Sequence, residues 1–360
     1  MTAYLRGPVS AILIFCACGC HRDPAPPPPR TLAEAASVED LPAAEKFIAA
    51  GAKIDQPDQD GNTPLMLSVC GKGTAMTDLL LLHGADVNFR SRGGETPLIL
   101  AVRVSRDDLV QRLISHGADV NQGDADSESP LLLAGASPRV LRLLLDAGAD
   151  VRARDLLGRT PLEAVSDLKI AAEMIARGAD VNAEDAQHYT PFKGAVLAGD
   201  VATVNFLAAH GANVDREGVG AQKLLTDALG SNTDGTLRAL VALGVDVNAA
   251  DAKGNTLLID PMWPVVDPTR IQWLIDAGAD LRRRNNASYT AREWAARTSR
   301  FARAEMFECY EKRLANPAVA TGSSAHVSVT TQPRWRLWRG SLLGSSEFAH
   351  RWWACCSPAC

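Results

Sequence analysis

The sequence predicts an all-α repeat protein, a solenoid of stacked helix-turn-helix units. Two markers that recur together predict this fold. The first is a glycine followed by Ala or Val and usually by Asp, and its successive copies lie 30 to 34 residues apart. The second is a Thr-Pro or Ser-Pro pair followed by Leu or Phe, twelve or thirteen residues after most of these glycines. The glycines are Gly51, Gly84, Gly117, Gly148, Gly178, Gly211, Gly244 and Gly278.

Each marker predicts one end of a helix. Thr and Ser are good N-caps, and Pro is favoured at the first helical position, so the Thr-Pro pairs predict where the first helix of each unit begins. The repeated Gly suits the left-handed residue just beyond a helix, so the second helix ends there. Residues three and four before the Gly are apolar, as in Leu80-Leu81 and Leu144-Leu145. This apolar stripe should pack against the neighbouring units.

The two markers resemble those of the ankyrin repeat, over residues 31–316. The resemblance implies an ankyrin solenoid of about eight units with N- and C-terminal caps. It also implies a projecting β-hairpin finger between each repeated Gly and the next Thr-Pro.

The first twenty residues predict a bacterial export signal. Arg6 precedes a short apolar run, which is too short to span a bilayer as a permanent helix. Small residues and cysteines follow and resemble the lipobox of bacterial lipoproteins. That resemblance implies lipidation of Cys20, with Cys18 as the alternative. The other interpretation is a cleaved secretory signal in which the cysteines are incidental.

Residues 21–30 predict an extended spacer. They contain the run Pro-Ala-Pro-Pro-Pro-Pro, which favours polyproline II and holds a folded domain away from its attachment point. Signal and spacer together predict a protein anchored by lipid in the bacterial cell envelope, facing the periplasm or the cell surface. The alternative location is soluble, either secreted or periplasmic.

Both ends of the array are expected to carry caps. Residues 31–50 lack the Thr-Pro opening and resemble an N-terminal cap, and residues 290–314 resemble a C-terminal cap. The apolar residues expected to close the core at the two ends are Phe47, Ile48, Trp294, Phe301 and Phe307.

The repeat pattern weakens towards the C-terminal end of the array. Lys223 and Leu224 replace Thr-Pro in the sixth unit, and Pro261 and Pro264 fall where the next first helix should run. We expect regular stacking before this region and irregular structure over 218–266. Either repeat decay or a partner site would account for the irregularity.

Residues 317–360 form a basic tail that contains tryptophan and cysteine. We expect a disordered extension, and the alternative is a segment that lies at a membrane interface. The net charge of −5 combines two unequal parts. Residues 1–280 have 24 Lys and Arg against 37 Asp and Glu, whereas residues 281–360 have 13 against 5. This distribution argues against a uniformly basic nucleic-acid binder.

No catalytic motif fits the repeat pattern, so an enzyme, a cofactor and a small-molecule substrate are not expected. The segment from Asp58 to Gly61 resembles a calcium loop but lacks the later bidentate acid, so we interpret it as a finger-tip turn. His83, His116 and His210 precede the repeated Gly. They are expected to interact with carbonyls at helix C-termini, not with a metal. Cys70 is expected to be a small buried side chain.

In arrays of this family the finger tips and first helices line a concave surface that binds proteins. Carried onto this sequence, the resemblance implies these partner-binding residues: Arg92, Glu95, Asp126, Glu128, Leu156, Leu157, Arg159, Gln187 and Tyr189. Leu156 and Leu157 are expected either to be an exposed anchor or to pack against the next finger. We expect charge reversal at Arg159 with Tyr189→Ala to weaken binding and to leave thermal melting unchanged.

The function predicted from the sequence is a non-enzymatic scaffold that binds another protein, anchored by lipid in the envelope. The alternative is a protective inhibitor or immunity-type protein that caps a toxin or an envelope enzyme. An acidic concave surface would suit a basic target of that kind.

Overall fold

The computed structural model describes residues 28–135, 137–230, 234–259 and 268–297, with residues 304, 307–308 and 310–312. The export signal with Cys18 and Cys20, and the tail from 317, lie outside the described residues. The chain divides into two compact units, Met1–Pro191 and Phe192–Cys360. Within the described ranges, no helix is both long and apolar enough to cross a membrane.

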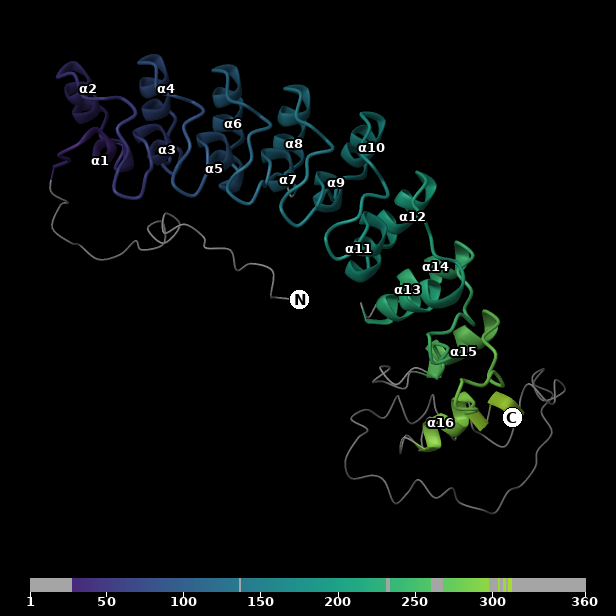
Figure 1. Cartoon of the computed structure of the whole chain (residues 1–360). Coiled ribbons are helices and arrows are strands. Elements are labelled where there is room, and N and C mark those ends of the chain that lie inside the picture. The colour runs from purple at the N-terminus through teal and green to yellow at the C-terminus, as the bar shows by residue number, and fades with distance from the viewer. Residues whose placement is uncertain are drawn as a thin grey trace, which may run out of the picture. The chain divides into compact units, whose positions relative to one another are not determined.

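The first unit is a stack of short helix pairs (Figure 1). The first helices of successive pairs contact one another in one row, and α6, α8 and α10 do so in a second row. The helices are α1 (Leu32–Ser37), α2 (Leu41–Ala49), α3 (Pro64–Val69), α4 (Ala75–Leu82), α5 (Pro97–Arg103), α6 (Asp107–Ser115), α7 (Pro130–Leu133), α8 (Pro138–Asp146), α9 (Pro161–Ala164) and α10 (Leu168–Ala176).

The second unit contains the remaining helices. Helix α11 begins at the last residue of the first unit. The helices are α11 (Pro191–Ala198), α12 (Val201–Ala209), α13 (Gly218–Gly230), α14 (Asp234–Ala242), α15 (Pro268–Asp276) and α16 (Ala291–Arg297).

The predicted helix starts are confirmed in the first unit. Thr63, Thr96 and Ser129 are N-caps, and the hydroxyl of each accepts a hydrogen bond from the N–H three residues later at 3.2–3.3 Å. Pro follows each cap as the first helical residue. This arrangement satisfies one orphan donor and places Pro where no donor is needed.

The predicted helix ends and core stripe are also confirmed. All eight repeated glycines have φ between 78° and 97°, a conformation that strains a residue with a Cβ atom. Next to Gly84, for example, the Ala85 N–H donates to the Leu80 carbonyl at 3.0 Å. The residues four before the glycines are fully buried in the regular units, as at Leu80, Leu113 and Leu144.

An asparagine clamp links consecutive units. The Asn88 Nδ2 amide donates to the Gly117 carbonyl at 3.1 Å, and its Oδ1 accepts from the Asp119 N–H at 2.8 Å. Asn121 and Asn248 make the same pair of contacts to the units that follow them. Each clamp therefore connects one connecting segment to the end of the following helix pair and to the start of the segment after it.

The expected β-hairpin fingers are not built from β-strands in the described residues. The segments project as expected, but their single antiparallel bridge is Ala250 with Thr256. Turns closed by side chains replace the expected strand ladder, because each finger is too short to pair more than its closing residues.

The caps close the stack only partly. Phe47 and Ile48 are half-buried in α2, where Ala44 is the one buried residue. At the other end Phe307 is fully buried and Trp294 is half-buried, whereas Phe301 lies outside the described residues.

The sixth repeat, which follows Gly211, departs from the pattern, as expected. Helix α13, with thirteen residues, occupies the sequence where a finger and a short first helix would lie. In the seventh repeat, a turn replaces the first helix, and its buried residues are Leu257, Leu258 and Ile259. Pro261 and Pro264 lie outside the described residues.

The clamp predicts a stability effect. Asn88→Ala removes two hydrogen bonds between consecutive repeats, so the Gly117 carbonyl and the Asp119 N–H lose the Asn88 side chain as a partner. It should lower the free energy of unfolding by about 1–3 kcal/mol, measured by denaturant titration followed by circular dichroism. The control is Gln59→Ala at an exposed finger tip, which should change stability by less than about 0.5 kcal/mol. Equal effects of the two substitutions would contradict the role of the clamp.

Candidate partner-binding surface

An aspartate carboxylate closes the tip of most fingers. In the fourth finger the Asp155 N–H donates to the Arg159 carbonyl at 3.2 Å, and Asp155 Oδ1 accepts from the N–H groups of Leu157 and Arg159 at 2.9 and 2.8 Å. The fourth residue of each tip has a left-handed backbone, which Gly158 adopts without strain. The aspartates that close tips in this way are Asp58, Asp124, Asp155, Asp185 and Asp251.

The sequence interpretations of the Asp58 loop and of two histidines agree with the structure. Asp58 Oδ1 accepts from the N–H groups of Asp60 and Asn62, so this loop is a finger-tip turn. The Nδ1 atoms of His116 and His210 lie 2.8 Å from the carbonyl oxygens four residues earlier, at helix C-termini. Cys70, in contrast, is half-exposed at the C-cap of α3, because its helix ends there.

Backbone hydrogen bonds join the tips of fingers three, four and five. The Leu156 N–H donates to the Asp126 carbonyl at 3.0 Å, and the Ala186 N–H donates to the Leu157 carbonyl at 2.7 Å. A similar bond runs from Ala125 to Gly93 at 3.3 Å. These bonds hold neighbouring tips in a fixed register, which limits the conformational entropy lost when a partner binds.

A network of ion pairs lies beneath the tips. Arg103, at the end of α5, is 2.6 Å from Asp124 Oδ2 and 3.2 Å from Glu128 Oε2. It is also 3.7 Å from Glu95 Oε1. Arg159 continues the network, with Nη2 2.7 Å from Glu128 Oε1 and Nε 2.6 Å from Asp155 Oδ2. The network therefore spans three consecutive units.

Three predicted partner-binding residues belong to this internal network. Glu95 is buried, and Glu128 and Arg159 are half-buried. Although partial burial opposes its charge, the hydrogen bonds and charges of Asp155 and Glu128 raise the pKa of Arg159 above its usual value. Its guanidinium thus has a structural role, so the expectation that reversing its charge leaves melting unchanged has to be revised.

The other predicted residues lie on the outside of the tips. Leu156 is 68% exposed and Leu157 46%, so of the two expectations for this pair the exposed one is observed. Arg92, Asp126 and Gln187 are exposed as well, and Tyr189 is half-buried.

Sequence reasoning missed Arg103, Asp124 and Asp155. The recurring Asp at the start of each tip was a visible signal for the two aspartates, because Asp favours turns that its own carboxylate can close. Nothing in the sequence around Arg103 shows that its partners lie more than twenty residues away, in the next finger.

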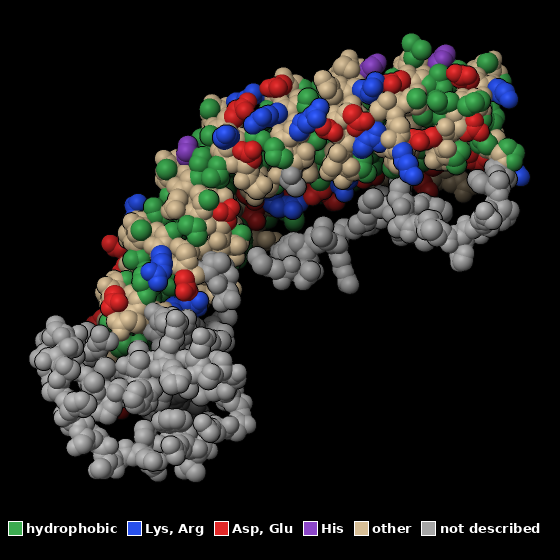
Figure 2. Space-filling model, turned by 180° about the vertical axis from the view of Figure 1, so that it is seen from behind, with side chains coloured by type: hydrophobic (Ala, Val, Ile, Leu, Met, Phe, Trp, Pro, Cys, Tyr) green, Lys and Arg blue, Asp and Glu red, His purple; other side chains and the backbone are tan. Residues whose placement is uncertain are grey.

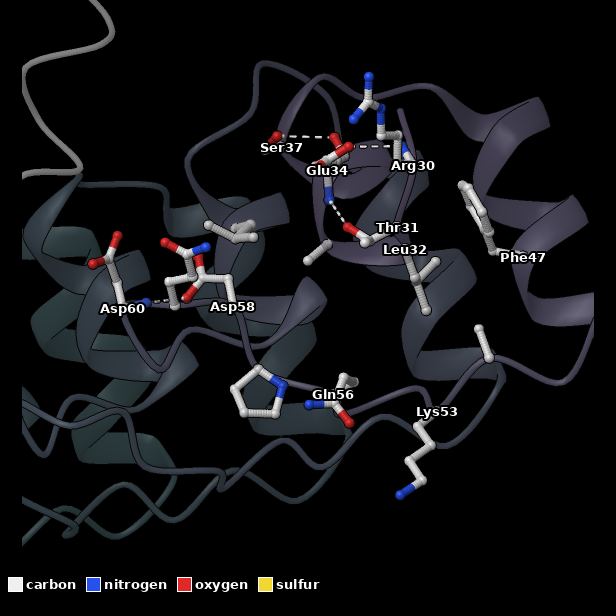
Figure 3. Close-up of a pocket in the computed structure, with 15 residues that line it drawn as sticks. Arg30, Thr31, Leu32, Glu34, Ser37, Phe47, Lys53, Gln56, Asp58 and Asp60 are labelled. Carbon is white, nitrogen blue, oxygen red and sulfur yellow. Dashed lines mark hydrogen bonds between the residues drawn. The ribbon is translucent and has the colours of Figure 1, made fainter. Parts of the chain in front are cut away.

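A second feature is a groove of about 680 Å³ at the start of the first unit. Figure 3 shows it between the beginning of α1 and the segment from Lys53 to Asp60, with Phe47 on a third side. Its polar groups are engaged locally. The Arg30 N–H donates to Glu34 Oε2 at 2.6 Å, and the Glu34 N–H donates to the Thr31 hydroxyl at 3.1 Å. The groove is thus part of the capped start of α1.

Charged side chains of both signs are dispersed over the array. Figure 2 shows acidic and basic side chains interspersed with apolar ones on one face. In the tips of the first unit, acidic fingers alternate with fingers that contain arginines, such as Asp58 and Asp60, then Arg90 and Arg92.

The comparison with known families identifies the first part of the array. Residues 32–124 match the family model described as ankyrin repeats (3 copies). This match covers the first part of the array only. The same caps, left-handed glycines and asparagine clamps continue beyond residue 124, so the fold is an all-α repeat solenoid. A comparison with curated proteins found no match. Ankyrin repeats are protein–protein interaction modules and generally non-enzymatic.

The network predicts the cost of reversing Arg159. Arg159→Glu would place a carboxylate beside Glu128 and Asp155, whose side chain is 2% exposed. The free energy of unfolding should fall by about 1–3 kcal/mol, measured by denaturant titration. Arg92→Glu is the matched control, since Arg92 has no ion-pair partner among the described residues. A melting temperature of Arg159→Glu equal to that of the control would show that the network contributes nothing.

Glu163 predicts a dependence on pH. It forms a capping box with Thr160 at the start of α9, and burial raises its pKa above the usual value despite the opposing hydrogen bonds from Thr160. A raised pKa in the folded state means that this group contributes stability below the unfolded pKa and loses it as pH rises through the folded value.

Glu163→Gln keeps an acceptor without the charge, so it should be at least as stable as the wild type at pH 7. The two proteins should converge below the usual glutamate pKa. Glu163→Ala should instead lose about 1 kcal/mol at pH 4, because the capping box is gone, and less at pH 7, where the wild-type carboxylate is charged at a cost. Thermal melts across this pH range test both statements, and a Gln variant less stable at pH 7 than at pH 4 relative to wild type would refute them.

Proposed function

We propose that this protein is a lipid-anchored scaffold of the bacterial cell envelope that binds a partner protein through the tips of its third, fourth and fifth fingers. The observation that carries the binding role is the exposed pair Leu156 and Leu157 on tips held in register by backbone bonds. Apolar side chains on a rigid support lose little conformational freedom when a partner covers them, so more of the burial energy is available for binding.

The anchor is supported by the beginning of the sequence. A short apolar run ends in small residues with Cys18 and Cys20, and a proline-rich spacer leads directly into the array. The expected spacer of residues 21–30 would extend about 3 Å per residue in polyproline II, so the array would remain close to the membrane surface.

The anchor is tested by metabolic labelling. Radiolabelled palmitate should enter the wild-type protein, and Cys20→Ser should abolish incorporation if Cys20 is acylated, whereas Cys18→Ser should not. Label that is absent from the wild type, or that persists when both cysteines are replaced, would show that the protein is not a lipoprotein.

The binding role is tested in the same cells by site-specific photo-crosslinking. A photoreactive residue at Asp126 or Gln187 should yield an adduct with a protein of the envelope. The same residue at Leu82, which is 81% exposed on α4 and not on a finger, should not. Identical adducts from both positions, or none from the tips, would refute the proposed surface. If the captured protein is an enzyme or toxin that loses activity in the complex, the inhibitor role applies.

A further inference from the structure

The apolar pair on the fourth finger has an unusual setting. Among the described residues, five large apolar side chains are exposed, and only Leu156 and Leu157 are neighbours in sequence. The carbonyl of Leu157 and the N–H of Leu156 are bonded to the adjoining tips, and the Leu157 N–H donates to Asp155, so most of the backbone polar groups beneath the pair are engaged. The pair is thus a small apolar platform on a braced support.

Acidic groups surround this platform. The tips spanning residues 124–128, 154–159 and 184–189 contain six acidic residues, of which Asp124, Glu128 and Asp155 are ion-paired with Arg103 or Arg159. Asp126 lies on the preceding finger and Glu184 at the base of the following one, and both are exposed. A partner that covers the platform therefore meets an exposed carboxylate on either side of it.

Among the described residues, neither Asp126 nor Glu184 forms an ion pair with an arginine. Arg159 is already neutralised from below by Asp155 and Glu128. Arg154 donates to the carbonyls of Gly158 and Glu184 at 2.9 and 2.7 Å, which fixes its guanidinium along the flank of the finger. His188 lies beside Glu184, with Nδ1 2.9 Å from Oε2.

We propose, on the basis of the binding role argued above, that this surface selects a cationic polypeptide segment. One aliphatic or aromatic side chain of that segment covers Leu156 and Leu157, and Lys or Arg side chains on either side of it meet Asp126 and Glu184. Apolar contact supplies the anchor, and the charges supply selectivity and rate of association.

The spacing of neighbouring repeats predicts where the cations lie in the bound peptide segment. Neighbouring helices pack about 8–10 Å apart, so acids on the fingers before and after the platform lie roughly that far to each side. An extended chain advances about 3.3 Å per residue, so the cations should stand about three residues before and after the apolar residue.

A random twelve-residue peptide display library, selected on the full-length protein, tests this proposal. Enriched peptides should have a net positive charge and share an apolar residue flanked by Lys or Arg. Affinity of the best peptide, measured by fluorescence polarisation, should fall at least tenfold in Leu156→Ser/Leu157→Ser. It should fall about three- to tenfold in Asp126→Asn/Glu184→Gln, and it should weaken as salt is raised.

The matched control is Leu82→Ser, which removes an equally exposed leucine outside the fingers and should leave affinity unchanged. Enrichment of neutral or acidic peptides, no enrichment at all, or equal binding by the double leucine variant would overturn the proposal. So would a wild-type dimer that the double leucine variant converts to monomer, because a second copy would then cover the platform.

The scaffold role in the envelope and the preference for a cationic segment can be tested separately. If photo-crosslinking at the tips captures an envelope protein but that capture survives both double variants, the scaffold role stands and the cationic segment does not. If the tips capture nothing while the basic peptides bind as described, the surface chemistry is correct and the scaffold role in the envelope is not.

Discussion

Every unit of this chain has an apolar helix face that only its neighbour can cover. The leucines four residues before Gly84, Gly117 and Gly148 belong to that face, and they are fully buried because neighbouring helix pairs pack against them. The rest of the structure depends on this stacking. The clamps and the finger bonds join groups that meet only when two units lie side by side, as Asn88 and Asp119 do.

The acidic character of the array follows largely from its turns. Eleven aspartates accept a hydrogen bond from the N–H two residues later, either after the repeated glycine or at a finger tip. They are Asp58, Asp86, Asp119, Asp124, Asp150, Asp155, Asp180, Asp185, Asp246, Asp251 and Asp280. The net charge of the array is therefore a poor guide to its partner, and the informative carboxylates are exposed ones that close no turn, such as Asp126 and Glu184.

Local patterns predicted much of the fold and part of the surface. The Thr-Pro caps, the left-handed glycines and the apolar stripe each depend on residues within one turn of helix, so they could be recognised without knowing the neighbours. The exposure of Leu156 and Leu157 was one of two alternatives, because only the position of the next finger decides whether a tip residue is covered. The β-hairpin expectation came from resemblance and overestimated how much strand pairing such short fingers form.

The sequence by itself determined that the chain is a stack of helix pairs, where the first helix of each regular repeat begins, where the second helix ends, and which apolar stripe forms the core. Only the tertiary structure decided which charged residues face a partner and which hold the stack together. Arg159 shows why. Its carboxylate neighbours come from its own tip and from the preceding unit, 31 residues away, and such pairs are set by how units stack and not by spacing along the chain. The same reason makes Leu156 and Leu157 an exposed platform, since the tips on both sides bond to their backbone and leave their side chains uncovered.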